Sequence, residues 1–205
     1  MKKTSLGELI ANAVSHGVGV LFAITYLILL LVKSNSITEA LVSTAFGVSM
    51  IVLYLSSTLF HSFPENMKRV YRVFQRFDHS SIFLLITGTY TPFIVLCADT
   101  LTGHILLGSL WLITITGIVF KSIWIDKFHY VHLALYVLMG WSVVLVWSDI
   151  QPNLGNSLWF LLIGGISYTL GVGFYVSRFK YAHFVWHIFV LLGSFMHFLA
   201  VWGIL

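Results

Sequence analysis

The chain consists largely of apolar stretches separated by short polar breaks. We place these stretches at residues 14–32, 42–62, 79–97, 103–121, 130–148, 156–176 and 183–203. A helix needs about 20 predominantly apolar residues to cross the hydrocarbon core of a bilayer, and each stretch is long enough for one crossing. The sequence therefore predicts an all-α polytopic membrane protein with seven transmembrane helices.

The composition leaves no room for a soluble domain of useful size. Of the 205 residues, 59% are hydrophobic and 9% are charged, whereas about a quarter of an ordinary soluble domain is charged. We expect residues 1–13 to form a short cytoplasmic N-terminal segment and residues 14–205 to form one transmembrane domain. The single cysteine, Cys97, excludes an internal disulfide and a cysteine-based zinc cage.

The basic residues favour one orientation in the membrane, because Lys and Arg near helix ends are retained on the cytoplasmic side. All of them except Lys33 lie before the first predicted span or in the second, fourth and sixth breaks. We therefore predict a cytoplasmic N-terminus and an external C-terminus. The net charge of +4 follows from this topology and requires no nucleic-acid partner.

Histidines gather at the predicted cytoplasmic ends of the spans. His61 ends the second span, Asp78 and His79 begin the third, and His129 and His132 begin the fifth. Ionisable residues within spans are rare and energetically costly, so they indicate a functional site. The alternative for any single histidine at the interface is a purely structural role, with a half-buried ring and hydrated nitrogens.

His183 and His187, at the start of the seventh span, form the most informative pair. Residues four apart lie on one face of a helix, where two imidazoles can bind one zinc ion. Ser57 and His61 repeat this spacing at the end of the second span. His197 lies ten residues after His187, roughly 15 Å along the helix, and so cannot bind the same metal.

A third imidazole would leave one position of a tetrahedral zinc ion open to water, as in catalytic zinc sites. A nearby carboxylate can orient such a water or accept its proton, and Asp78 is the best placed. The alternative role for Asp78 is to cap the third helix. Spacing leaves four histidines eligible as the third ligand, namely His61, His79, His129 and His132.

Glycines in the sixth predicted span suggest close helix packing. Small residues allow membrane helices to approach one another. The expected close-packing positions are Gly164, Gly165, Gly171 and Gly173.

Four segments together resemble the haemolysin III-like bacterial branch of the progestin and adipoQ receptor family, over nearly the full chain. They are GELIANAVSHGVG, with Glu8, Asn12 and His16; SSTLFHSF, with Ser57 and His61; FDHSSIFLLITGTYTPF, with Asp78; and HFVWHIFVLLGSFMHF, with His183, His187 and His197. The resemblance implies a seven-helix fold with an inward N-terminus.

The same resemblance implies a set of site residues. Zinc would be held by His61, His183 and His187, with Asp78 beside the attacking water and Ser57 in the same cavity as the second catalytic residue. Three further residues, spaced by four along the first helix, would support the zinc cavity by hydrogen bonds, namely Glu8, Asn12 and His16.

The family is also similar to alkaline ceramidases, which hydrolyse lipid amides with a Ser, Asp and three-His pattern. This similarity implies a zinc-dependent hydrolase of a lipid amide or ester, tied to membrane homeostasis. It would lie in the bacterial inner membrane with the zinc near the cytoplasmic face, and membrane lipids would be its substrate or ligand. The short outer loops and the lack of a long N-terminal extension argue against a protein hormone as ligand.

Three other functions are open at this stage. A non-catalytic sensor or receptor would use zinc to join the second and seventh spans. A cytolytic pore, suggested by the haemolysin name, would need a polar lining through the whole membrane, whereas the polar residues here gather at one end. A haem protein would use the membrane histidines as iron ligands.

Overall fold

The computed structural model describes residues 5–125 and 127–205, and the helix is the main element throughout them. The elements are α1 (Leu6–Lys33), α2 (Ile37–Ser62), α3 (Lys68–Cys97), α4 (Leu101–Ile123), α5 (His129–Trp141), the short 3-10 helix η1 (Ser142–Val146), α6 (Trp147–Leu154), α7 (Ser157–Tyr175) and α8 (Ala182–Ile204). Lys2 and Lys3, which contribute to the predicted orientation, lie outside the described residues.

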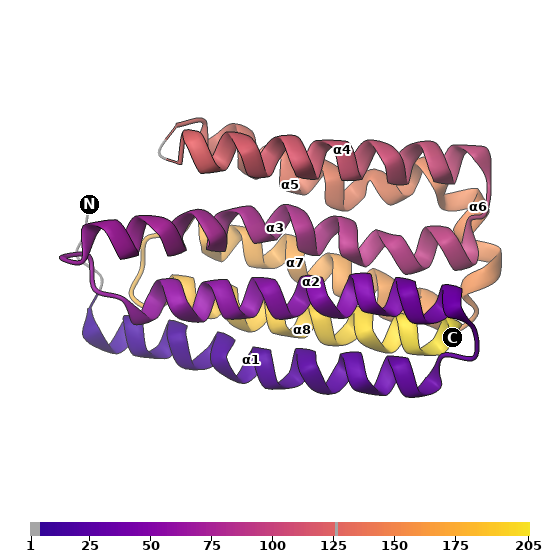
Figure 1. Ribbon diagram of the computed structural model, residues 1–205, viewed down its shortest axis with the longest axis horizontal. Coiled ribbons are helices and arrows are strands. Elements are labelled where there is room, and N and C mark those ends of the chain that lie inside the picture. The colour runs from indigo at the N-terminus through magenta and orange to yellow at the C-terminus, as the bar shows by residue number, and fades with distance from the viewer. Residues whose placement is uncertain (1–4, 126) are drawn as a thin grey trace.

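Seven helical stretches of the described chain are long and apolar enough to cross a membrane. Six are single helices, and the other runs from Tyr130 to Leu154 through α5, η1 and α6. The all-α fold with seven spans is thereby confirmed. Figure 1 shows the long helices side by side, with the start of α1 and the end of α8 at opposite ends of the bundle. Which end faces the cytoplasm stays a prediction.

α1 begins well before the predicted apolar stretch. Its N-terminus is fixed by a capping box, in which Glu8 N–H donates to Ser5 Oγ and the Glu8 carboxylate accepts from Ser5 N–H. This reciprocal pair satisfies two backbone donors that a helix start would otherwise leave unpaired. Residues 6–13 are therefore helical.

α3 begins at Lys68, so most of the predicted break at residues 63–78 is helical. Asp78 lies well inside this helix, and the alternative role for it as an N-cap is wrong, because the residue at the cap position is Met67. The first turns of α3 are amphipathic, and their aromatic rings pack on the end of α2, with Tyr71 4.9 Å from Phe60. Hydropathy missed these turns because their other face is basic.

The predicted break at residues 149–155 is also largely wrong. Residues up to Leu154 continue the fifth span as α6, and only Gly155 and Asn156 separate α6 from α7. Gly155 has a φ of 51°, in the left-handed region that glycine adopts without steric cost. A single tight reversal thus replaces the expected loop.

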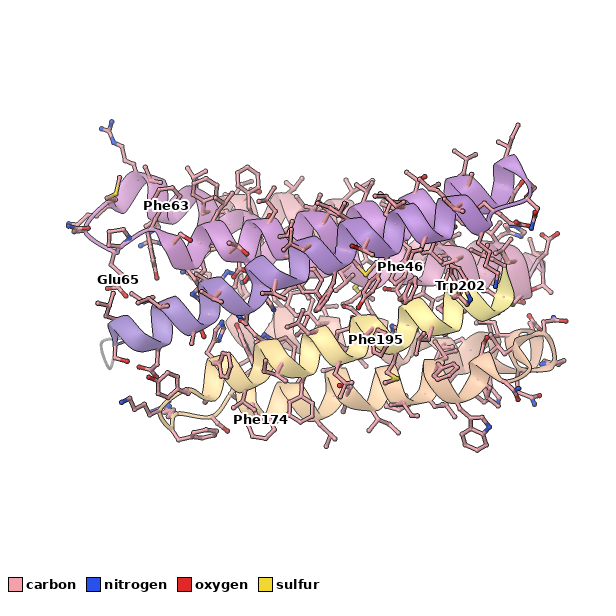
Figure 2. All side chains as sticks on the ribbon, turned by 90° about the horizontal axis from the view of Figure 1, so that it is seen from below. Phe46, Phe63, Glu65, Phe174, Phe195 and Trp202 are labelled. Atoms are coloured by element: carbon pink, nitrogen blue, oxygen red, sulfur yellow. The ribbon has the colours of Figure 1, made fainter. Side chains whose placement is uncertain are left out.

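The core lies between α1, α2, α3, η1, α6 and α8, which share the larger group of buried apolar side chains, and α7 packs partly buried side chains against it. Phe46 is fully buried there, whereas Phe195 and Trp202 are each more than one-third exposed; Figure 2 labels all three. α4 and α5 pack on the other side of α3 around a second buried group that includes Phe83 and Leu110. Apolar side chains both inside and outside are what a bilayer solvent requires.

Two of the four glycines that we predicted to be close-packing positions are closely packed against α8. A Cβ added to Gly171 would lie 2.7 Å from the Trp186 ring, and one added to Gly164 would overlap His197. At Gly165 and Gly173 a Cβ would meet no described atom within 4 Å, so the prediction is wrong for these two. Two glycines of α7 thus let α8 approach closely.

Candidate metal centre

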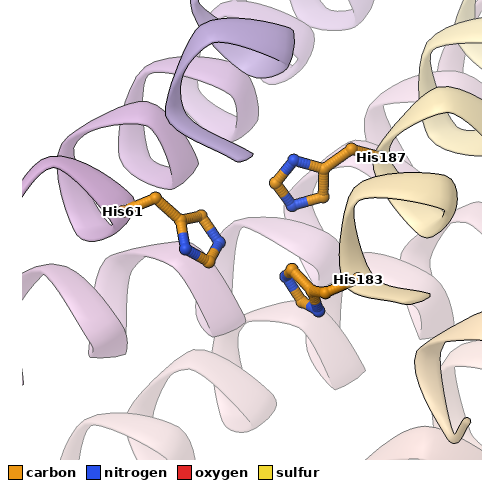
Figure 3. Close-up of side chains that lie close together, drawn as sticks. All are labelled: His61, His183 and His187. Atoms are coloured by element: carbon orange, nitrogen blue, oxygen red, sulfur yellow. The ribbon is translucent and has the colours of Figure 1, made fainter. Parts of the chain in front are cut away.

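α2 and α8 bring three histidines together near one end of the bundle. His61 lies in the last turn of α2, and His183 and His187 lie one turn apart at the start of α8. Each offers one ring nitrogen, and these atoms all lie within 4.8 Å of one another. Figure 3 shows the three rings converging between the helices. We call this set the histidine cluster.

The chemistry of the cluster suits a transition metal. Imidazole nitrogen is a common ligand of zinc, copper, iron and nickel. The ring centroids lie 4.7–5.1 Å apart, and His61 and His187 are buried. His61 Nε2 is buried and has no hydrogen-bond partner among the described residues, and such an atom is one that a metal ion would satisfy. The residues present therefore fit a metal ion.

The orientation of His187 is fixed by α1. Its Nδ1 lies 3.2 Å from the Asn12 carbonyl oxygen and 3.0 Å from Ser15 Oγ, which itself donates to the same carbonyl. A carbonyl oxygen only accepts hydrogen bonds, so Nδ1 carries the hydrogen and Nε2 keeps its lone pair. A metal-binding histidine is typically oriented in this way through its other nitrogen.

The three residues predicted to support the cavity make different contacts. The His16 ring stacks on His187, with centroids 3.5 Å apart and an interplanar angle of 6°. Asn12 acts through its backbone carbonyl, and its side-chain oxygen is buried with no partner among the described residues. Glu8 lies away from the cluster and accepts a hydrogen bond from Tyr181 N–H at 2.9 Å, next to the start of α8.

Ser57 and Asp78 lie beside the histidine cluster. Both line a cavity of about 300 Å³ together with His183 and His187, which we call the histidine cavity. The Ser57 hydroxyl lies beside the Asp78 carboxylate in this cavity. Asp78 also lies 3.7 Å from Nδ1 of His79, which lines the same cavity. A carboxylate, a hydroxyl and two cluster imidazoles thus line one cavity.

The remaining histidines are placed elsewhere. His132 is buried in α5, with Nδ1 2.8 Å from the Phe128 carbonyl oxygen. His197 lies deeper in the bundle, with Nε2 3.2 Å from the Leu161 carbonyl oxygen. Neither belongs to the one group of possible metal ligands found in the described residues. The side chain of His129 lies outside the described residues.

The sequence analysis did not identify Ser15, which contacts His187. It accepts from His187 on one side and donates to Asn12 on the other, although serine is common in membrane helices and attracts no notice alone. Its position three residues after Asn12, on the same helix face, was the available signal.

The whole chain is similar to known proteins. The sequence model of the family described as "Haemolysin-III related" matches residues 7–198. "Hemolysin-3" of Bacillus cereus is 39% identical over 199 residues, which cover 95% of this chain and 90% of that protein. The human "Monocyte to macrophage differentiation factor" is 29% identical over 206 residues, which cover 98% of this chain and 85% of that protein.

Proposed function

The chain belongs to the haemolysin III-related family, within the progestin and adipoQ receptor proteins, and on that premise we propose that it is a zinc-dependent hydrolase of a membrane lipid amide or ester. The observation that carries the proposal is the shared cavity of Asp78, Ser57, His183 and His187. It combines possible metal ligands with a proton acceptor in one buried space.

In this proposal His61, His183 and His187 hold the zinc through their ring nitrogens. Three protein ligands leave a position for water or substrate, which distinguishes catalytic from structural zinc sites. When bound, zinc polarises a carbonyl and lowers the pKa of water. The hydrogen bond from His187 Nδ1–H to the Asn12 carbonyl keeps Nε2 directed at the metal.

Asp78 is the proton carrier of the proposed reaction. Its carboxylate accepts a proton as water attacks the carbonyl carbon, and returns that proton to the leaving nitrogen or oxygen when the C–N or C–O bond breaks. In this proposal the neighbouring Ser57 hydroxyl donates its hydrogen to the carboxylate and orients it. The walls of the histidine cavity limit access of bulk water to the reacting carbonyl.

The position of the site suits a lipid substrate. The cluster lies toward the same end of the bundle as the start of α3, where Lys68, Arg69 and Arg72 are exposed. Basic residues favour the cytoplasmic side, so we place the site near the cytoplasmic face of the bacterial plasma membrane. A headgroup linkage at that depth would reach the histidine cavity, and membrane lipids are the expected substrates.

Product formation tests the proposal. Purified protein in lipid nanodiscs, loaded with zinc, is incubated with phospholipids and ceramide-like amides, and released fatty acid is measured by mass spectrometry. We expect release from at least one lipid class, lost in the Asp78→Asn variant. Release that persists in this variant, or that is equal in zinc-free protein, would contradict the mechanism.

The second candidate is a sensor in which zinc joins two helix ends. It is favoured by the division of the cluster, since His61 comes from α2 while His183 and His187 come from α8. A metal there would link segments far apart in sequence. Zinc that raises Tm while no lipid in the set is hydrolysed would favour this candidate.

A further inference from the structure

The first turns of α3 extend beyond the apolar part of the helix. α3 has 30 residues, which is about 45 Å at the helical rise per residue, whereas the hydrocarbon core of a bilayer is about 30 Å thick. The excess length projects at the start of α3, because its charged residues gather there. Figure 1 shows this start extending past the adjacent ends of α4 and α5. Residues 68–77 therefore lie at the depth of lipid headgroups.

A row of basic residues runs along these turns. Lys68, Arg72 and Arg76 are spaced by four and so share one helix face. Lys68 and Arg72 are exposed, and Arg76 is half-buried, with an Nε that has no hydrogen-bond partner among the described residues. The ion pairs found in the described part of the chain involve His79 and His104. Lys68 and Arg76 are therefore not paired with a described acid.

The adjacent row combines a basic residue with apolar ones. Arg69, Val73 and Phe77 are also spaced by four, and Val73 and Phe77 are 44% and 56% exposed. Along this row an exposed cation at the helix start is followed, toward the membrane core, by two exposed apolar side chains. A molecule with an anionic group and a hydrocarbon chain would match that order.

The positive charge lies where a helix disfavours it. A helix N-terminus carries a partial positive charge and is stabilised by acidic side chains or anions. α1 and α2 have Glu8 and Glu39 in their first turns, whereas the first turn of α3 has no acidic residue and no side-chain cap. Lys68 and Arg69 add to the unfavourable charge there. An anion from outside the chain would offset it.

We propose that these turns bind one anionic phospholipid, with its phosphate held by the basic side chains of both rows and an acyl chain along Val73 and Phe77. Arg and Lys form charge-assisted hydrogen bonds with phosphate, and Arg can do so through two N–H groups. Basic clusters beside a membrane helix attract anionic lipids. Arg69 and Phe77 are about 12 Å apart along the helix, so the headgroup and part of the chain can make contact together. The inference goes beyond the proposed hydrolase and does not depend on it.

Four basic residues at this end of the bundle provide a matched pair of variants. Lys68→Gln/Arg69→Gln removes two charges from the proposed site. Arg178→Gln/Lys180→Gln removes two charges from the loop before α8, where both side chains are exposed. The two variants have the same net charge. A general attraction of anionic lipid to this end of the protein would therefore weaken equally in both.

Native mass spectrometry tests the inference. Full-length protein in a neutral detergent is titrated with phosphatidylglycerol or phosphatidylcholine, both with ether-linked chains, so that neither offers an ester or amide to the proposed hydrolase. We expect one phosphatidylglycerol to bind about tenfold or more tightly than phosphatidylcholine. Lys68→Gln/Arg69→Gln should lose about thirtyfold in affinity for phosphatidylglycerol. Arg178→Gln/Lys180→Gln should lose about twofold or less, because exposed charges at a distance are screened.

The proposal fails if phosphatidylcholine binds as tightly as phosphatidylglycerol, or if the two double variants lose affinity equally. Glycerol phosphate at the same concentration should not displace the lipid, and displacement would mean that the chain makes no contact. A Lys68→Arg/Arg69→Lys variant keeps both charges and should keep the affinity. A thirtyfold loss in that variant would show that charge is not what binds the lipid, and would also overturn the proposal.

Discussion

The imidazole rings of His16 and His187 are parallel, with their centroids 3.5 Å apart. His16 comes from α1 and His187 from α8, so the stack joins the first and last helices at the depth of the histidine cluster. Both His16 nitrogens are buried without hydrogen-bond partners among the described residues. The ring therefore acts on His187 through its face, by limiting how far His187 can rotate.

A His16→Ala substitution should weaken zinc binding about tenfold, within the usual effect of groups that orient a metal ligand. His16→Phe should stay close to the native affinity, because a phenyl ring can occupy the same stacked position. Competition titration with a zinc-sensitive dye measures both. Equal losses in the two variants would show that a His16 nitrogen is required.

Replacing a member of the histidine cluster should remove most of the metal. We expect about one zinc per chain in the native protein and only a small fraction of that in the His61→Ala, His183→Ala and His187→Ala variants. Metal analysis by mass spectrometry on folded, monodisperse protein measures this. Chelation of zinc from the native protein should also lower Tm, because binding to the folded state alone stabilises it.

His132→Ala and His197→Ala are the controls, because both histidines lie outside the cluster. They should retain zinc. Loss of metal from a folded His132 or His197 variant, or full metal in the His187 variant, would mean that the assigned ligands are wrong.

Asp78→Asn should retain most of the zinc and lose hydrolysis by about a hundredfold or more, the usual range for a lost proton acceptor. The amide preserves the shape of the side chain but accepts protons poorly. Ser57→Ala should have a smaller effect, since it removes only the hydroxyl that we propose orients Asp78. Initial rates of fatty-acid release, normalised to bound zinc, distinguish this result from simple metal loss.

The orientation can be tested without reference to chemistry. A reporter fused after Leu205 should be external, and one inserted between Glu65 and Lys68 should be cytoplasmic. Alkaline phosphatase and green fluorescent protein fusions give opposite signals on the two sides. The same signal at both positions would rule out the predicted topology.

Glu8→Ala should lower Tm, and Glu8→Gln should lower it less, because the amide can still accept from Tyr181 N–H. Glu39→Ala is the matched control. Glu39 also serves at a helix N-terminus, where it accepts from Asn35 N–H within its own turn. A larger effect at Glu8 than at Glu39 in thermal unfolding would assign the difference to the contact between α1 and α8.

Hydropathy was sufficient to predict the spans, because each must be apolar over the thickness of a bilayer. It was insufficient at residues 68–78, where α3 continues with a basic face and packs on α2 through Tyr71. Amphipathic turns of this kind are held by tertiary contacts rather than by average apolarity.

The histidine cluster was only partly predictable. Helical spacing paired His183 with His187 but left His61, His79, His129 and His132 equivalent, because spacing does not fix how distant helices pack. The family resemblance selected His61, and the structure places His61 beside the pair. The contact of Ser15 with His187 depends on the rotation of α1 against α8, which no single segment encodes.

The hydrogen bond between Glu8 and Tyr181 joins residues that are 173 positions apart. During synthesis Glu8 leaves the ribosome early, whereas Tyr181 emerges with the last helix. The histidine cluster likewise forms only after α8 is made, because His61 comes from α2 while His183 and His187 come from α8. A ribosome that stalls before α8 releases a chain without the contact between α1 and α8. Such a chain carries only one histidine of the cluster, His61. If the cluster holds a metal, only the complete chain can retain it, and a quality-control protease would meet incomplete chains in which α1 lacks its contact with α8.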